Sequence, residues 1–186
     1  MLNICKTKSL IREAVLHSME TKSLNRITAV DLAEEIGISR ATLYRYYGSV
    51  NDIISEMEDE FFEGMRDCSR YYISAPLEFN RRETPYPGIV AVAKYMEENR
   101  RFFLAITGPN GDKNFVLRWH KLIREFYSGK LAYEGLSSEN SDIYMELILA
   151  GSEAVVRYWF EQRSDLSAEE IAPIIQRLLY DPFARR

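Results

Sequence analysis

The sequence contains little of what metal-based or covalent chemistry requires. Among its 186 residues there are only two cysteines, Cys5 and Cys68, and two histidines, His17 and His120. The cysteines lack metal-ligand spacing, and no Asp, Cys or second His stands at ligand spacing from either histidine. We therefore expect no metal ion, no cofactor and no disulfide framework, and a reducing compartment such as a bacterial-type cytoplasm.

Long apolar runs are also missing. No stretch approaches the roughly 20 apolar residues that a membrane-spanning helix needs, and the first residues, MLNICKTKSLIREAV, lack the apolar core of a signal peptide. The chain nevertheless has 46% apolar and 28% charged residues, which is enough apolar material to build a core. We expect no membrane contact, and either one large globular domain or a small domain joined to a larger one.

Catalytic constellations are absent as well. Two pairs of adjacent acids, Glu97–Glu98 and Glu169–Glu170, fit solvated helix faces or a helix start, and no nucleophile with a matching base accompanies them. Of the function classes considered, an enzyme is the one that the residues do not support, although turnover traceable to His120 would revive it. We expect that the protein is not an enzyme.

The charge is unevenly distributed along the chain. Residues 1–50 hold seven Lys or Arg and five Asp or Glu, whereas residues 51–186 hold 17 and 23, so the net charges are +2 and −6. A basic head on an acidic body has the sign expected of a DNA-binding domain joined to a second domain.

Apolar residues recur at helical spacing along nearly the whole chain, and no strand pattern competes with them. Helices are expected over residues 9–19, 28–36, 40–47, 49–72, 112–133, 141–162 and 168–179, with one more beginning near Pro87 and another in YMEENRRFFLAIT. The stretches SAPLEFNRRETPYPG, GPNGD and EGLSSENS indicate loops. The sequence thus predicts an all-α fold of about nine helices in two domains, residues 1–50 and 51–186.

Two short helices and the turn between them form the most informative motif. Thr28 and Ser39 are suitable N-caps, and Gly37 is suited to end the first of the two helices. A helix, a Gly-containing turn and a second short helix are typical of the helix-turn-helix, whose second helix enters the major groove of DNA. The buried side is expected to comprise Ile36, Ile38, Leu43 and Tyr47.

The other side of the second helix is rich in hydroxyl, aromatic and basic groups that suit DNA. Arginine binds guanine edges or phosphates, hydroxyls reach phosphate oxygens, and helix N-termini direct N–H groups and a positive dipole end toward the backbone. The expected DNA contacts are Thr28, Ser39, Arg40, Thr42, Tyr44, Arg45 and Tyr46. The alternative is that the aromatic and charged side chains pack on a neighbouring helix and that Arg40 is merely solvated.

The stretch ITAVDLAEEIGISRATLYRYYGSVNDII resembles the N-terminal domain of TetR-family regulators, whose pattern runs T-x-x-x-I-A-x-x-x-G-V-S-x-x-T-x-Y-x-[HY]-F. Matching positions, within a resemblance over roughly residues 6–60, are Thr28, Leu32, Ala33, Gly37, Ile38, Ser39, Thr42, Leu43, Tyr44, Tyr46 and Tyr47. One departure is Val50, where the family usually has a lysine that meets a phosphate. The departure predicts weaker operator binding, with a salt slope lower by about one.

The rest of the chain, through YMEENRRFFLAITGPNGDKNFVLRWHKLI and GSEAVVRYWF, resembles a C-terminal type found among TetR-like regulators, including those of dihydroxyacetone-kinase operons. Within this type, some members answer to a partner protein instead of a small molecule. The resemblance implies an effector pocket whose candidate residues are Cys68, Tyr72, Phe102, Phe103, Trp119, Phe126, Met145 and Trp159. The alternative for each of these side chains is ordinary hydrophobic core.

The same resemblance implies a homodimer in which the last two helices of each copy form a four-helix bundle with a twofold axis. The candidate interface residues are Gly151, Val155, Tyr158, Ile171, Ile174 and Leu178. In an isolated domain the apolar members of this set would all be core.

The resemblance therefore implies a cytoplasmic transcriptional regulator, by family default a repressor, that binds a palindromic double-stranded DNA operator as a homodimer. A small-molecule or protein effector would release it. Two alternatives remain open: a DNA-binding dimer whose second domain is solid core and senses nothing, and an activator that works through a partner protein. The absence of a cavity among the C-terminal aromatic residues would favour the first alternative.

Overall fold

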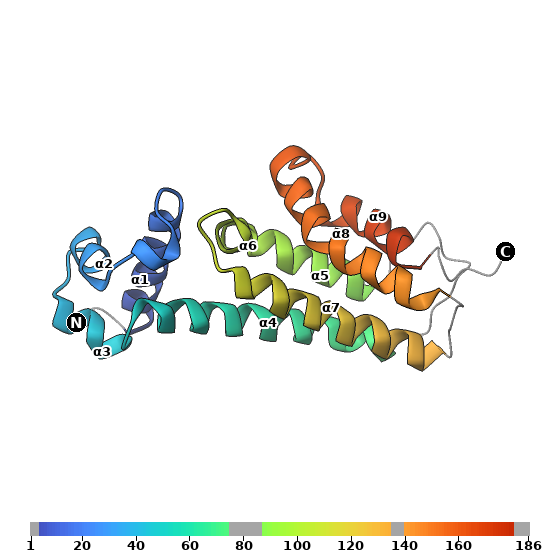
Figure 1. The fold of residues 1–186 in the computed structure, drawn as a ribbon, viewed down its shortest axis with the longest axis horizontal. Helices are drawn as coiled ribbons and strands as arrows, with labels where there is room; N and C mark the ends of the chain where they lie inside the picture. Colours follow the sequence, from blue (N-terminus) through green and yellow to red (C-terminus); the bar gives the residue numbers. More distant parts are fainter. Residues whose placement is uncertain (1–3, 75–86, 135–139, 181–186) are drawn as a thin grey trace. The chain divides into compact units, whose positions relative to one another are not determined.

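The computed structural model describes residues 4–74, 87–134 and 140–180, excluding the side chains of residues 71–74, 133–134 and 180. Over these residues the chain forms nine α-helices and one short 3-10 helix, and no strand, which confirms the predicted all-α fold (Figure 1). Every helix in this part of the chain is too short or too polar to cross a lipid bilayer.

Two compact units divide the chain. The N-terminal unit comprises Met1–Phe61 and Arg101–Phe115, and the C-terminal unit comprises Phe62–Arg100 and Val116–Arg186. The unit boundaries differ from the expected division at residue 50, because the first part of the fourth helix and a later segment join the N-terminal unit. The division into domains 1–50 and 51–186 stays a prediction.

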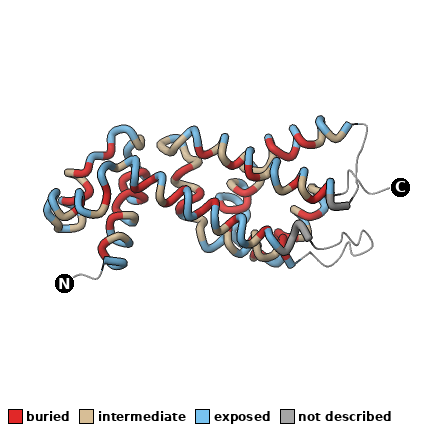
Figure 2. The backbone as a smooth tube through the Cα atoms, turned by 90° about the horizontal axis from the view of Figure 1, so that it is seen from below, coloured by how far each residue is buried: buried red, intermediate tan, exposed pale blue. Residues whose placement is uncertain are grey.

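The N-terminal unit begins with α1 (Ile4–Met19), η1 (Leu24–Arg26), α2 (Ala29–Glu35) and α3 (Arg40–Tyr46). Buried residues follow one side of α1 at helical spacing, and exposed residues follow the other. Figure 2 shows how buried and exposed positions alternate along the helices of the described residues. The helix starts five residues earlier than the sequence indicated. Its first turns look polar, yet Thr7 is buried there and extends the packed side of the helix.

The later segment of the N-terminal unit is attached by specific contacts. The backbone N–H of Leu24 donates to the carbonyl of Asn110 at 3.0 Å, and the side-chain amide of Asn110 donates to the carbonyl of Met19 at 3.1 Å. Arg101, at the start of α6 (Arg100–Thr107), forms ion pairs with Glu13 and Glu20 of α1. These contacts explain why a segment distant in sequence belongs to this unit.

Four phenylalanines form the aromatic centre of the N-terminal unit. The ring of Phe61 lies 5.4 Å from that of Phe102, 6.3 Å from that of Phe103 and 5.5 Å from that of Phe115, measured between centroids. All four side chains are buried. Tilted and edge-on ring pairs of this kind add roughly 1 kcal/mol each beyond the burial of their area.

The C-terminal unit consists of the remainder of α4 (Val50–Ser74), α5 (Pro87–Glu98), most of α7 (Lys113–Glu134), α8 (Ser141–Gln162) and α9 (Ala168–Tyr180). Within it, α9 packs against both α5 and α8. α4 runs to Ser74, close to the end near Tyr72 that the sequence predicted. The buried stripe of α4 continues through Ser69, a small polar residue whose hydroxyl donates to the carbonyl of Met65 at 2.8 Å.

Candidate functional site

The turn between α2 and α3 has the geometry of a Schellman motif. The N–H of Ile38 donates to the carbonyl of Ala33 at 2.9 Å, and the N–H of Gly37 donates to that of Glu34 at 3.2 Å. Gly37 has φ +68°, a left-handed conformation that favours glycine because it has no Cβ. The turn therefore fixes the direction in which α3 leaves α2.

Side-chain caps define the starts of both helices. The hydroxyl of Thr28 accepts the N–H of Asp31 at 3.2 Å while the Asp31 carboxylate accepts the N–H of Thr28 at 3.4 Å, which is a capping box. The hydroxyl of Ser39 accepts the N–H of Thr42 at 3.0 Å. Each cap satisfies an otherwise unpaired helix donor, typically worth about 1 kcal/mol.

α3 has one buried side and one exposed side. Leu43 is fully buried and Tyr47, which follows the last residue of α3, is 4% exposed. Tyr44 is 53% exposed, and Arg40 and Arg45 are also exposed.

The remaining four predicted DNA contacts are on α3 or at the N-caps of α2 and α3. Thr28 and Ser39 are exposed, Thr42 and Tyr46 are half-buried, and the Arg45 guanidinium lies 5.5 Å from the Tyr46 ring centroid. Ile36 and Ile38, expected on the buried side, are only half-buried because they belong to the turn.

A cluster of charged groups holds the end of α3 to α4 and α1. The Tyr47 hydroxyl donates to Glu56 Oε1 at 2.7 Å, and Lys8 Nζ donates to both carboxylate oxygens of Glu56, at 3.0 and 2.8 Å. Arg12 donates to Glu56 at 2.5 Å and to Glu60 at 2.7 and 2.6 Å. The Lys8 ammonium also lies 4.9 Å from the centroid of the Tyr47 ring. We call Lys8, Arg12, Tyr47, Glu56 and Glu60 the anchor cluster.

The anchor cluster was not foreseen from the sequence. Its members lie on different helices, with Glu56 separated from Arg12 by 44 residues and from Lys8 by 48, so no local pattern connects them. One signal was available. The TetR pattern has phenylalanine where this chain has Tyr47, and a buried hydroxyl requires a hydrogen-bond partner.

The electrostatics of the cluster favour ionised Glu56. Partial burial raises the pKa of Glu56, but hydrogen bonds from Lys8, Tyr47 and Arg12 outweigh this effect and lower the pKa from 4.5 to about 2. The hydrogen bond to Glu56 in turn raises the pKa of Lys8. Burial raises the pKa of Tyr47, so the hydroxyl stays a donor.

We predict acid-sensitive stability from this arrangement. Because the folded-state pKa of Glu56 is depressed to about 2, its contribution is fully present above about pH 4.5 and is lost as the pH falls toward 2. The Glu56 side chain is 32% exposed, and solvent screening therefore limits the contribution to about 1–2 kcal/mol. Urea unfolding of wild type and Glu56→Gln at several pH values measures it.

The free energies of unfolding of the two proteins should differ most at pH 6 and converge toward pH 2.5. Glu63→Gln removes an exposed glutamate from the same helix and should show a smaller and flatter difference. A gap between wild type and Glu56→Gln that does not narrow on acidification would contradict the assignment.

Val50 is the first residue of α4 and is half-buried. The preceding Ser49 hydroxyl accepts the N–H of Asp52 at 3.2 Å and caps the helix. At this position the chain therefore offers a helix N-terminus with a hydroxyl cap but no ammonium group. The lower salt slope expected from the sequence remains a prediction.

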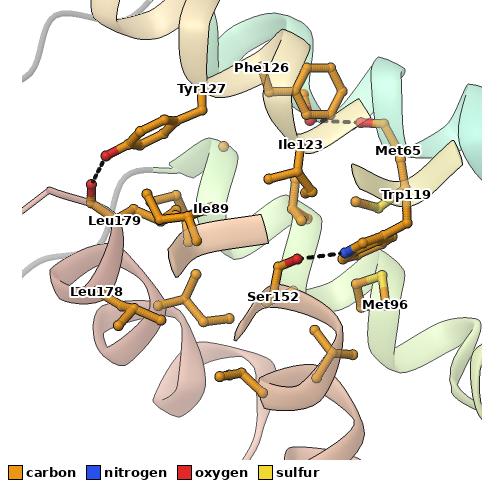
Figure 3. A pocket seen from close by; sticks show the side chains of 18 of the residues that line it. Met65, Ile89, Met96, Trp119, Ile123, Phe126, Tyr127, Ser152, Leu178 and Leu179 are labelled. Atoms are coloured by element: carbon orange, nitrogen blue, oxygen red, sulfur yellow. Dashed lines mark hydrogen bonds between the residues drawn. The ribbon is translucent and has the colours of Figure 1, made fainter. Parts of the chain in front are cut away.

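The C-terminal unit contains a partly open cavity of about 130 Å³, lined by residues of five helices (Figure 3). We call it the effector cavity, after the effector pocket that the sequence resemblance implies; that role stays a prediction. Three of the residues expected there, Trp119, Phe126 and Trp159, line it. The side chains that complete it come from all five helices and include Met65 of α4 and Met96 of α5. A second domain with a solid core, which the sequence left open as an alternative, would have no such cavity.

The other residues expected in the pocket lie elsewhere. Phe102 and Phe103 belong to the aromatic centre of the N-terminal unit. Met145 does not line the cavity, but it packs in a small cluster with Tyr127 and Ile148, which do. Cys68 is half-buried on α4, where burial raises the pKa of its thiol. The Tyr72 side chain lies outside the described residues.

Large apolar side chains are exposed along one side of α8 and on α9. We call this surface the α8–α9 apolar face. Its members and their exposed fractions are Ile143 (56%), Leu147 (64%), Tyr158 (60%), Ile174 (53%) and Leu178 (51%). Exposed Ala150 and Ala154 lie between the larger residues of α8, and nothing would contact a Cβ added at Gly151.

The expected interface residues divide between two environments. Tyr158 and Ile174 are on the α8–α9 apolar face, Ile171 is buried inside the unit and Val155 lines the effector cavity. Leu178 belongs to both, since it is 51% exposed and also lines the cavity (Figure 3). Ile143 and Leu147 are also on this face, but they were not among the interface residues expected from the sequence. Together with Tyr158 they follow helical spacing, but the periodicity alone does not say which stripe of α8 is left uncovered.

Comparison with known proteins places the chain in a family. A family model for the C-terminal region of transcriptional regulators, TetR_C_8, matches residues 83–181, just over half of the 186 residues. The structure is similar to that of the TetR-family regulator PfmR from Thermus thermophilus. The TM-score is 0.65 with 19% sequence identity, over 92% of this chain and 94% of PfmR.

Two curated relatives are similar in sequence. The HTH-type regulator YxbF of Bacillus subtilis (strain 168), described as uncharacterized, is 21% identical over 91% of this chain. DhaS of Lactococcus lactis subsp. lactis (strain IL1403), an activator of the dhaKLM operon, is 22% identical over 63%. The matches span 43% of YxbF and 58% of DhaS. The chain belongs to the TetR family of helix-turn-helix transcriptional regulators.

Proposed function

We propose that this regulator binds a pseudo-palindromic operator as a homodimer, with α3 of each copy in a major groove. The observation that carries the proposal is the division of α3. Leu43 and Tyr47 fix it to the N-terminal unit, while Arg40, Tyr44 and Arg45 are exposed. A helix held rigidly on one side, with basic and hydroxyl groups on the other, suits base and phosphate recognition.

The roles of the seven contact residues follow from their chemistry. Arg40 and Arg45 would bind guanine edges or phosphates, and the Thr42, Tyr44 and Tyr46 hydroxyls would bind phosphates. Thr28 is exposed, and its hydroxyl accepts a hydrogen bond in the helix cap, so its own proton is left to donate to a phosphate oxygen. Ser39, which caps α3, is proposed in the same role. Its hydroxyl lies 2.8 Å from that of Thr42, so one of these two hydroxyl protons is used between them and the other is left for a phosphate.

The twofold axis of the operator requires two copies of the chain. The α8–α9 apolar face supports dimerisation, because five large apolar side chains, each more than half exposed, are costly to leave in water. The small residues between them, including Gly151, would allow two copies of α8 to approach closely. An isologous contact through this face would form the expected four-helix bundle.

Regulation is proposed to act through the effector cavity. A ligand that binds one conformation of the C-terminal unit better than another shifts the population of the dimer between operator-competent and operator-incompetent states. In the proposed mechanism the liganded state binds the operator less tightly, and the protein represses transcription from the cytoplasm by occupying its operator until the ligand arrives.

Activation is the second candidate. It is favoured by the relative DhaS, whose name describes an operon activator. The two candidates differ in the sign of a reporter response. Expression from a promoter carrying the selected operator should fall when the protein is supplied, if it represses, and should rise if it activates.

Selection of bound sites from a random DNA pool, with purified protein near physiological salt, tests the central proposal. We expect an enriched palindrome whose half-sites are separated by about one helical turn, or a multiple of it. A folded dimer that enriches no palindrome would overturn the proposed mode of binding.

A further inference from the structure

The effector cavity has no hydrogen-bond donor to spare among its described lining residues. Trp119 Nε1 donates to the Ser152 hydroxyl at 2.8 Å, and that hydroxyl donates to the carbonyl of Leu149 at 3.0 Å. The Tyr127 hydroxyl donates to the carbonyl of Leu179 at 2.6 Å (Figure 3).

The two remaining polar side chains of the lining are satisfied in the same way. Ser69 donates to the carbonyl of Met65 at 2.8 Å, and Trp159 Nε1 donates to that of Leu166 at 2.9 Å. A polar ligand would therefore have to break a hydrogen bond of the protein before it could accept one.

Charge is lacking as well. Among the described residues that line the cavity there is no Lys, Arg, His, Asp or Glu. An ionised ligand would lose its hydration without gaining an opposite charge, which is strongly unfavourable. The lining therefore selects against carboxylates, phosphates and ammonium groups.

The volume and the lining side chains indicate the size and shape of the ligand. An engineered apolar protein cavity of about 150 Å³ stays dry and binds benzene, and the effector cavity has about 130 Å³. The rings of Trp119, Phe126 and Trp159 offer edge and face contacts to another ring, and the sulfur atoms of Met65 and Met96 offer contacts to ring edges.

We propose that the effector cavity binds a neutral monocyclic aromatic molecule of about six to eight non-hydrogen atoms, such as an alkylbenzene. The effector role of this ligand rests on the proposed function. The binding of this ligand does not rest on the proposed function, because binding can be measured on the protein without DNA. At this size a dissociation constant of about 0.1–1 mM is expected.

Toluene is the first probe, and tryptophan fluorescence is the readout. The chain has two tryptophans, Trp119 and Trp159, and both line the cavity. Toluene should change their emission saturably and raise the Tm. Phenol has the same number of non-hydrogen atoms, and it should bind at least about tenfold more weakly because its hydroxyl loses hydration. No saturable toluene binding, or tighter binding of phenol or benzoate, would overturn the proposal.

Variants of two valines on α5 test whether toluene binds in the effector cavity. Val92 and Val90 are both half-buried on α5, but only Val92 lines the cavity. Val92→Phe should fill the space and abolish toluene binding, and Val90→Phe should keep it. If Val92→Phe does not fold, Ile123→Ala enlarges the cavity from α7 and should admit n-propylbenzene more tightly than wild type does. If both valine variants change toluene affinity equally, or if Ile123→Ala does not bind n-propylbenzene more tightly, the ligand binds outside the effector cavity.

A separate titration distinguishes the binding of the ligand from its role as an effector. Operator affinity is measured with and without saturating toluene, in wild type and in Val92→Phe. A loss of affinity confined to wild type supports both the ligand class and the proposed regulation. Toluene binding without any change in operator affinity supports the ligand class and overturns the proposed effector release.

Discussion

Replacement of Arg45 by alanine is expected to weaken operator binding by about tenfold to a hundredfold while leaving the free energy of unfolding almost unchanged. Arg45 is exposed, and its only described partner is the ring of Tyr46, so its removal leaves no buried group unpaired. In the proposed complex each half-site loses one arginine contact. Titration of the selected operator with wild type and variant, at several salt concentrations, measures both the affinity and the salt slope.

The salt dependence tells which group of the DNA Arg45 contacts. Loss of a phosphate contact weakens binding to all sequences and lowers the salt slope by about one per half-site, whereas loss of a guanine contact relaxes specificity at one base pair. Arg66→Ala removes an equal charge from an exposed position on α4, within the C-terminal unit, and serves as the control. Unchanged operator binding by Arg45→Ala would remove Arg45 from the set of contacts.

Replacement of Leu147 by glutamate is expected to dissociate the dimer and to lower operator affinity by about a hundredfold or more, because the two heads then bind their half-sites independently. Leu147 is 64% exposed on the α8 part of the α8–α9 apolar face. In the proposed bundle it meets the partner copy, where an unpaired carboxylate would be buried at a high cost in free energy. Sedimentation and operator titration measure the two effects.

Leu117→Glu is a matched control for this experiment. Leu117 is 67% exposed, like Leu147, but it lies on α7 and outside the α8–α9 apolar face. It should leave the dimer and the operator affinity intact. Two variants that are equally dimeric would show that this face is not the interface, and equal dissociation of both would show that the charge acts nonspecifically.

Local features of the fold were predictable because short-range chemistry sets them. Thr28, Ser39 and Gly37 determine helix starts and a turn through hydrogen bonds and backbone preferences within a few residues. The two sides of α3 also follow from spacing alone, since Leu43 and Tyr47 are four residues apart and lie on the same side of the helical path. The resemblance to TetR regulators rests on these same positions.

Assignment of aromatic residues to particular clusters was not predictable in this way. Helical spacing indicates that Phe103 and Trp119 are both buried, but it does not say in which cluster. In the structure Phe103 packs with Phe61 and Phe115, whereas Trp119 faces the effector cavity. The difference depends on which helices meet, and hence on contacts between residues far apart in the chain.

The all-α fold, the capped helix-turn-helix and the exposed side of α3 are therefore predictable from the sequence, because propensity, capping and periodicity act locally. Three features become visible only in the folded protein. Glu56 accepts hydrogen bonds from Lys8, Arg12 and Tyr47, one apolar stripe of α8 is exposed, and every donor of the described cavity lining is already used. Each of these depends on the packing of helices distant in sequence, where the spacing of residues along one helix carries no information about its neighbours.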